Sequence, residues 1–163
     1  MKYPVTWITL LLVKDNANII DYNNWSGGDY LGSSYLNHAS SVAVEVSAEW
    51  HVNGSKSFKA TTTTPNTVSS GYFYTIINVI SETTYKFTAN LKNNGETSTV
   101  RLFARQGSST SNQKLVGSVS CTTGETMSIV ITGTIPTDYN RLLLMFPCVN
   151  GTVFIDNLQL VQQ

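Results

Sequence analysis

Charged residues are scarce in this chain. They make up 12% of its 163 residues, and ten basic and ten acidic residues cancel to a net charge of zero. The charged share is about half of the usual one, and serine, threonine and asparagine fill roughly a third of the positions instead. Long charged side chains favour helices, whereas threonine, valine, isoleucine and aromatic residues favour strands. The composition therefore predicts β structure with polar, uncharged surfaces.

Clustered basic residues and long apolar runs are also lacking. Without a basic stripe the chain has no signature of nucleic-acid binding, and no lysine or arginine cluster indicates a membrane surface. The apolar segment 5–13 is too short to span a bilayer, and no small-residue cleavage site follows it. We expect no membrane insertion. We predict an extended arm or strand at residues 1–15, with other protein subunits as candidate partners, and one domain at 16–163.

Cysteine is nearly absent, with Cys121 and Cys148 the two instances. They form no C-x-x-C spacing and have no histidine nearby in sequence, which argues against a zinc or redox site. They could pair if the fold places them on adjacent strands. Two separate, half-buried thiols are the favoured interpretation.

Short apolar and alternating segments, separated by turn signals such as Asn53-Gly54, occupy most of the chain. In the segment 42–50, for example, Val42, Val44 and Val46 fall on one face. No stretch has a helical period. The number and spacing of the segments predict an all-β sandwich or jelly roll. The expected strands are 42–50, 57–62, 72–80, 84–91, 99–105, 114–121, 126–132, 141–146 and 152–161.

Three motifs in order give a resemblance to a known family. Residues 51–60 (HVNGSKSFKA) carry an h-x-G-x-x-S-hydrophobic turn, 76–92 (IINVISETTYKFTANLK) a strand, a short turn and a T-Y-x-F-x-A strand, and 151–160 (GTVFIDNLQL) a closing strand. Over residues 16–162 the chain resembles carbohydrate-binding modules of families 4 and 22. The resemblance implies a jelly-roll β-sandwich of two antiparallel sheets with a sugar-binding face, a structural calcium and no catalytic activity.

Catalytic constellations are missing from the sequence. The histidines are His38 and His51, and no phosphate loop, zinc-protease motif or nucleophile elbow occurs. Glu45 and Glu49 lie four residues apart in an expected strand, which would separate them by roughly 13 Å. That is too far for the carboxylate pair of a glycosidase. We therefore expect solvated carboxylates and a protein that is not an enzyme.

A calcium site is implied by the resemblance alone. Asp156 would supply a carboxylate, with the backbone carbonyl of Lys56 and Asp21 nearby. Calcium takes six to eight oxygen ligands, among them carbonyls. The alternative is that Asp156 satisfies backbone donors near the end of its strand.

Aromatic and arginine side chains are the candidate sugar contacts, because sugar rings stack on aromatic faces and sugar hydroxyls bind amides and guanidinium groups. Alternation in 99–105 places Arg101, Phe103 and Arg105 on an exposed face, opposite an aliphatic one. The alternative is that about half of the aromatic candidates are core residues. The candidates are Trp25, Tyr30 and Tyr35 in a loop, Trp50, and, on strand faces, Tyr72, Tyr74, Arg101, Phe103 and Arg105.

The sequence thus supports two functions of different classes. The first is a non-catalytic module that binds a polysaccharide or glycan on an extracellular, cell or virion surface. The second is a structural subunit, either a capsid decoration or tail protein of a virion or part of a surface adhesin. The neutral charge and the apolar arm favour the second.

Overall fold

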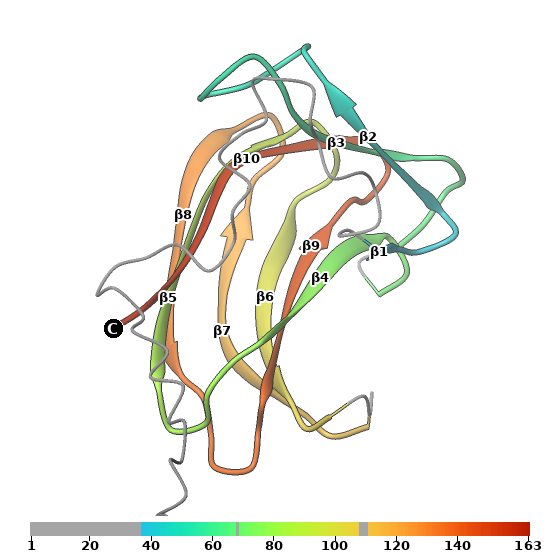
Figure 1. The fold of residues 1–163 in the computed structure, drawn as a ribbon. Helices are drawn as coiled ribbons and strands as arrows, with labels where there is room; N and C mark the ends of the chain where they lie inside the picture. Colours follow the sequence, from blue (N-terminus) through green and yellow to red (C-terminus); the bar gives the residue numbers. More distant parts are fainter. Residues whose placement is uncertain (1–36, 68, 108–110) are drawn as a thin grey trace, which may run out of the picture.

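A computed structural model describes residues 37–67, 69–107 and 111–163 (Figure 1). Within these ranges the secondary structure consists of strands, and no helix suited to crossing a membrane is found there. The strands are β1 (Asn37–His38), β2 (Val42–Ser47), β3 (Ser57–Thr62), β4 (Tyr72–Asn78), β5 (Thr84–Asn93), β6 (Ser98–Arg105), β7 (Gln113–Cys121), β8 (Thr126–Thr134), β9 (Arg141–Pro147) and β10 (Thr152–Gln162).

The strands form two antiparallel sheets that face each other as two layers (Figure 1). The first sheet has the order β1-β4-β9-β6-β7, and the second has the order β2-β3-β10-β5-β8. Strands that follow one another in sequence repeatedly lie in opposite sheets, so the chain crosses between the layers. This arrangement confirms the predicted jelly-roll sandwich.

Alternation along the strands builds the core between the sheets. In β5 every second residue from Tyr85 to Leu91 is buried, as the T-Y-x-F-x-A motif predicts. Phe73 stacks on Phe146 with ring centroids 5.1 Å apart, and Phe87 from the opposite sheet reaches the same ring at 6.0 Å. Aromatic pairs at this separation stabilise a core beyond their buried area. These contacts join the two layers.

Two glycines let the edge strands β7 and β8 approach each other and close one side of the sandwich. A Cβ atom on Gly117 would lie 2.4 Å from Cγ2 of Ile131, and one on Gly133 would lie 2.1 Å from Cγ1 of Val116. A Cβ atom at either position would force the neighbouring side chain to move, so glycine suits this close approach.

Strand β2 is shorter than predicted, and this overturns one expectation. It ends at Ser47 rather than at residue 50. The backbone amide of Glu49 donates to the Ser47 hydroxyl at 3.1 Å. Local bonds of this kind compete with strand pairing. The chain bends there, and Glu45 and Glu49 both contact Nζ of Lys59, Glu45 at 3.5 Å. The predicted separation of about 13 Å was therefore wrong, because it assumed a continuous strand. The hydrogen bond that Lys59 donates to the Glu49 carboxylate raises the pKa of Lys59.

The two cysteines remain separate thiols. Cys121 ends β7 and Cys148 follows β9, and both are fully rather than half buried. Burial raises the pKa of each thiol above its ordinary value. Both thiols are therefore protonated core groups at neutral pH.

Candidate functional site

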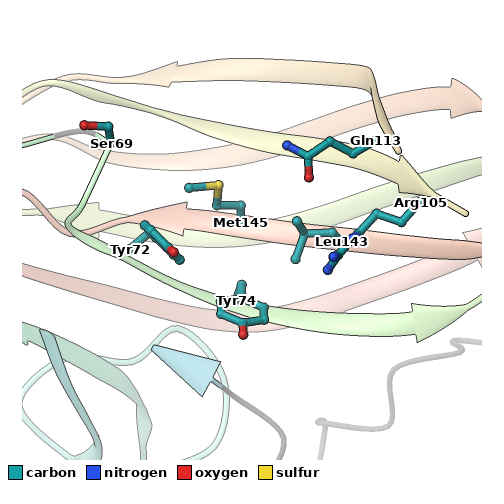
Figure 2. Close-up of a pocket in the computed structure, with 7 residues that line it drawn as sticks. All are labelled: Ser69, Tyr72, Tyr74, Arg105, Gln113, Leu143 and Met145. Carbon is teal, nitrogen blue, oxygen red and sulfur yellow. The ribbon is translucent and has the colours of Figure 1, made fainter. Parts of the chain in front are cut away.

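A pocket of about 280 Å³ opens on the outer face of the first sheet, the face turned away from the core (Figure 2). Strands β4, β9, β6 and β7 supply most of it. Its lining residues are Ser69, Tyr72, Tyr74, Arg105, Gln113, Leu143 and Met145.

Strand alternation decides which side chains face the pocket. Phe73 is completely buried in the core, so its neighbours Tyr72 and Tyr74 point outward. On β9 the buried Leu144 is likewise flanked by outward-facing Leu143 and Met145. The pocket wall therefore follows from the same pattern that fills the core.

Register arranges the outward side chains in rows across the strands. The first row joins Tyr74 on β4 to Met145 on β9 and Arg101 on β6. A second row, the apolar row, consists of Ile76, Leu143, Phe103 and Leu115. A third row, which we call the basic row, carries two arginines and consists of Asn78, Arg141, Arg105 and Gln113.

The tyrosine pair supplies the aromatic surface of the site. The rings of Tyr72 and Tyr74 have centroids 6.0 Å apart and planes inclined at 45°. Both side chains are half-buried, and the described residues provide no hydrogen-bond partner for either hydroxyl. Two phenol groups are thus available to a molecule in the pocket, because each can donate and accept.

Arg105 differs from the expectation of an exposed side chain. It is 6% exposed, although it lines the pocket. Its strand, β6, lies inside the sheet between β9 and β7, so Arg141 and Gln113 flank it on both sides. Arg101 and Phe103, on the same face, are half-buried. This arginine–phenylalanine set is therefore partly enclosed rather than fully exposed.

The structure unites some of the predicted sugar contacts and separates others. Tyr72, Tyr74 and Arg105 line one pocket, and Arg101 and Phe103 adjoin it on β6. Trp50 lies after β2 in the other sheet, where it packs on Phe154 with ring centroids 6.1 Å apart. The remaining candidates Trp25, Tyr30 and Tyr35 fall outside the described residues.

Sequence reasoning missed four lining residues. Leu143 and Met145 belong to a strand that is apolar on both faces, so alternation gives no signal of which side chains face outward. Gln113 and Ser69 come to the pocket through strand order and loop placement. The sequence of β4 does carry a signal, because its two tyrosines share one face of the strand and the phenylalanine between them lies on the other, buried face.

Asp156 is committed to backbone amides. It is buried, and its Oδ2 accepts from Val52 at 2.6 Å and from Asn53 at 2.9 Å, while its Oδ1 accepts from Asn157 at 2.8 Å. A carboxylate has about four lone-pair positions, and three are filled here. This geometry fits the alternative role predicted for Asp156, the satisfaction of backbone donors.

Calcium does not fit readily among these contacts. An ion on Asp156 could use the one lone-pair position that the three amides leave free, and no group of three or more His, Cys, Asp or Glu side chains suited to a metal occurs in the described part of the chain. Asp21 falls outside that part, and the role of the Lys56 carbonyl stays a prediction. Calcium binding likewise stays a prediction.

Comparison with known proteins gives matches at the level of structure. No family model and no curated protein sequence matches the chain. A family 22 xylan-binding domain of Paenibacillus barcinonensis Xyn10C superimposes with a TM-score of 0.61 at 11% identity, covering 81% of this chain and 94% of that one. Modules of family 4 also match. The chain has the jelly-roll fold of these modules.

Two longer proteins contain the same fold as one part. The Clostridium thermocellum xylanase 10B structure, with family 22 and GH10 modules and xylohexaose, matches with a TM-score of 0.61 at 15% identity, over 78% of this chain. The enzymatically active domain of bacteriophage CBA120 tailspike protein 4 matches with a TM-score of 0.65 at 15% identity, over 90% of this chain. This chain spans 26% and 21% of their respective lengths. At such identities the likeness establishes the fold.

Proposed function

We propose that this chain is a non-catalytic carbohydrate-binding module that holds a polysaccharide on the outer face of its first sheet. The observation that carries the proposal is the pocket in which Tyr72, Tyr74 and Arg105 converge. Ligand sites combine an apolar wall with a few placed polar groups. Here the tyrosine rings and Leu143 form that wall, and Arg105 and Gln113 supply polar groups.

The chemistry of the pocket suits a sugar. The C–H face of a sugar ring packs on an aromatic ring, and its hydroxyls bind phenol, amide and guanidinium groups. The apolar row continues across the sheet from Ile76 to Leu115, which are 37% and 53% exposed. A chain of sugars lying across the strands would follow this row. The fold shared with a xylan-binding domain supports a polysaccharide as the ligand.

Binding without catalysis is supported by the kind of groups in the pocket. Hydrolysis of a glycosidic bond needs a pair of carboxyl groups, one on each side of the bond. The lining residues bear hydroxyl, guanidinium, amide, aliphatic and thioether groups. We infer that the bound polysaccharide is released unchanged.

Affinity electrophoresis tests the proposal. Gels that contain soluble xylan, mixed-linkage glucan, galactan or an acidic polysaccharide should retard the protein relative to a reference protein of similar size. Reducing-sugar release from the retained polysaccharide should stay at the level of the blank. Migration unaffected by every polysaccharide of the series would refute the function, and sugar release would refute the lack of catalysis.

A second candidate function is a role within a particle or adhesin. The match with the phage tailspike domain supports it, because that domain matches 90% of this chain. In this case residues 1–15 would contact other subunits, and the module would be displayed on a virion or cell surface. Sedimentation of the full chain and of a variant lacking residues 1–15 tests this. An assembly lost on deletion is expected, and two monomers would exclude the role for the arm.

A further inference from the structure

The two sheets differ in the balance of charged residues in their strands. The five strands of the first sheet carry three arginines and one lysine and not a single aspartate or glutamate. The strands of the second sheet carry three lysines, Lys59, Lys86 and Lys92, and two acidic residues, Glu45, which pairs with Lys59, and Asp156, which is bound to amides. The chain as a whole is neutral. The sheet that bears the pocket is therefore the one whose strands carry positive charge without an acidic residue.

The register places three of these charges, those of the arginines, on the face that bears the pocket. Arg105 lines the pocket and is directly opposite Arg141 on β9, so the basic row brings two guanidinium groups to one end. Arg101 lies four residues before Arg105 on β6, on the same face, about 13 Å away along the strand. A ligand across this face thus meets cationic groups on both sides of the apolar row.

Arg101 is the most available of these groups. It is half-buried, and the described residues offer it neither an ion pair nor a hydrogen bond. Its row continues through Met145 to Tyr74, two strand spacings or about 10 Å away. A guanidinium group held beside an aromatic surface binds a carboxylate through two parallel hydrogen bonds.

Resting on the proposed function, we propose that this face selects acidic polysaccharides, whose uronate carboxylates bind Arg101 while their rings pack on the tyrosines and the apolar row. A neutral polysaccharide would use the same apolar surface but leave the guanidinium unpaired. Because burial strengthens a charged pair relative to water, the carboxylate adds affinity as well as selectivity.

Paired ligands test this selectivity. Polygalacturonate, alginate and glucuronoxylan are each compared with their carboxyl-reduced forms by titration calorimetry at low and moderate salt. The acidic form should bind more tightly by about tenfold or more. The advantage should shrink as salt rises, because salt screens a partly exposed pair.

Matched variants locate the effect. R101Q should lose the advantage of the acidic forms, and R101K should keep only part of it, because lysine cannot form the bidentate pair. K86Q changes the same charge on the outer face of the second sheet and should leave the advantage unchanged.

The outcomes separate the two proposals. Equal affinity for both members of each pair would overturn the acidic selectivity and leave carbohydrate binding intact. An advantage that persists in R101Q would overturn the role of Arg101. Binding to none of these ligands and to none of the polysaccharides in the electrophoresis series would overturn both proposals, whereas loss of the advantage in R101Q with unchanged melting temperature supports them.

Discussion

The rings of Tyr72 and Tyr74 lie side by side on the outer face of the first sheet, with centroids 6.0 Å apart. Two residues along one strand point to the same side, so Phe73 between them can fill the core while they face the pocket. Strand β4 pairs with β9 along its whole length, which fixes the position of both rings. The pair is therefore a rigid aromatic surface rather than a mobile loop contact.

Removal of the Tyr74 ring should weaken polysaccharide binding. Tyr74→Ala is expected to lower affinity by about tenfold, because the truncated side chain removes a central aromatic contact. Tyr74→Phe retains the ring and loses the hydroxyl, and should bind more tightly than Tyr74→Ala. Calorimetry on the retained polysaccharide measures both, and melting curves confirm that the variants are folded.

Trp50→Ala is the matched control, because Trp50 is an aromatic residue that follows β2 and packs on Phe154 of the second sheet. It should keep the affinity of the unmodified protein. A loss equal to that of Tyr74→Ala would mean that the pocket is not the binding surface.

Much of the fold was predictable because period-two alternation survives wherever one face of a strand is buried. The strand 57–62 matches β3, and all other predicted bounds except the end of β2 lie within two residues of the observed ones. Strand β1 was missed, since it has two residues, Asn37 and His38, and exists through pairing with β4. The predicted strand 42–50 is longer than β2, because the alternation of apolar residues continues past Ser47. The Ser47 hydroxyl accepts a hydrogen bond from the Glu49 amide, and the strand ends there.

The site was harder to predict than the fold. Tyr72, Tyr74 and Arg105 could be nominated from single strands, but their common pocket depends on β9 lying between β4 and β6. Strand order is set by contacts between distant parts of the chain, and no local pattern encodes it. Trp50 shows the same difficulty, because an aromatic residue near a strand end serves either a pocket or local packing.

The Asp156 carboxylate should stabilise the fold through its amide contacts. Asp156→Ala removes the acceptor for Val52, Asn53 and Asn157, and should lower the free energy of unfolding by about 2 kcal/mol. Urea denaturation in the presence of a chelator measures this loss without metal.

Calcium would add a separate signature at the same residue. If the ion binds here, calcium raises the melting temperature of the unmodified protein and leaves that of Asp156→Ala unchanged. Identical melting curves with calcium and with chelator would end the calcium hypothesis.

A reciprocal pair of asparagines joins the loop before β4 to the turn before β10. The backbone amide of Asn66 donates to Oδ1 of Asn150 at 3.0 Å, and the backbone amide of Asn150 donates to Oδ1 of Asn66 at 3.2 Å. Nδ2 of Asn66 also donates to the Cys148 carbonyl at 3.1 Å. Asn66→Ala removes the acceptor for the Asn150 backbone amide and a donor to the buried Cys148 carbonyl, and should cost about 2 kcal/mol in urea denaturation. Asn94→Ala, at an exposed position, should change stability by less than about 0.5 kcal/mol.

The buried thiols should make stability fall in alkaline solution. Burial raises the pKa of Cys121 and Cys148 above the ordinary 9.0, so above pH 9 the unfolded chain releases protons that the folded chain retains. The unfolded state then binds fewer protons, and the free energy of unfolding decreases as pH rises. Below pH 9 both states hold the protons and the effect disappears. In urea denaturation between pH 9 and 10.5, the free energy of unfolding of the Cys121→Ala, Cys148→Ala double variant should fall less steeply with pH than that of the unmodified protein. Equal slopes for the two proteins would show that the thiols do not contribute.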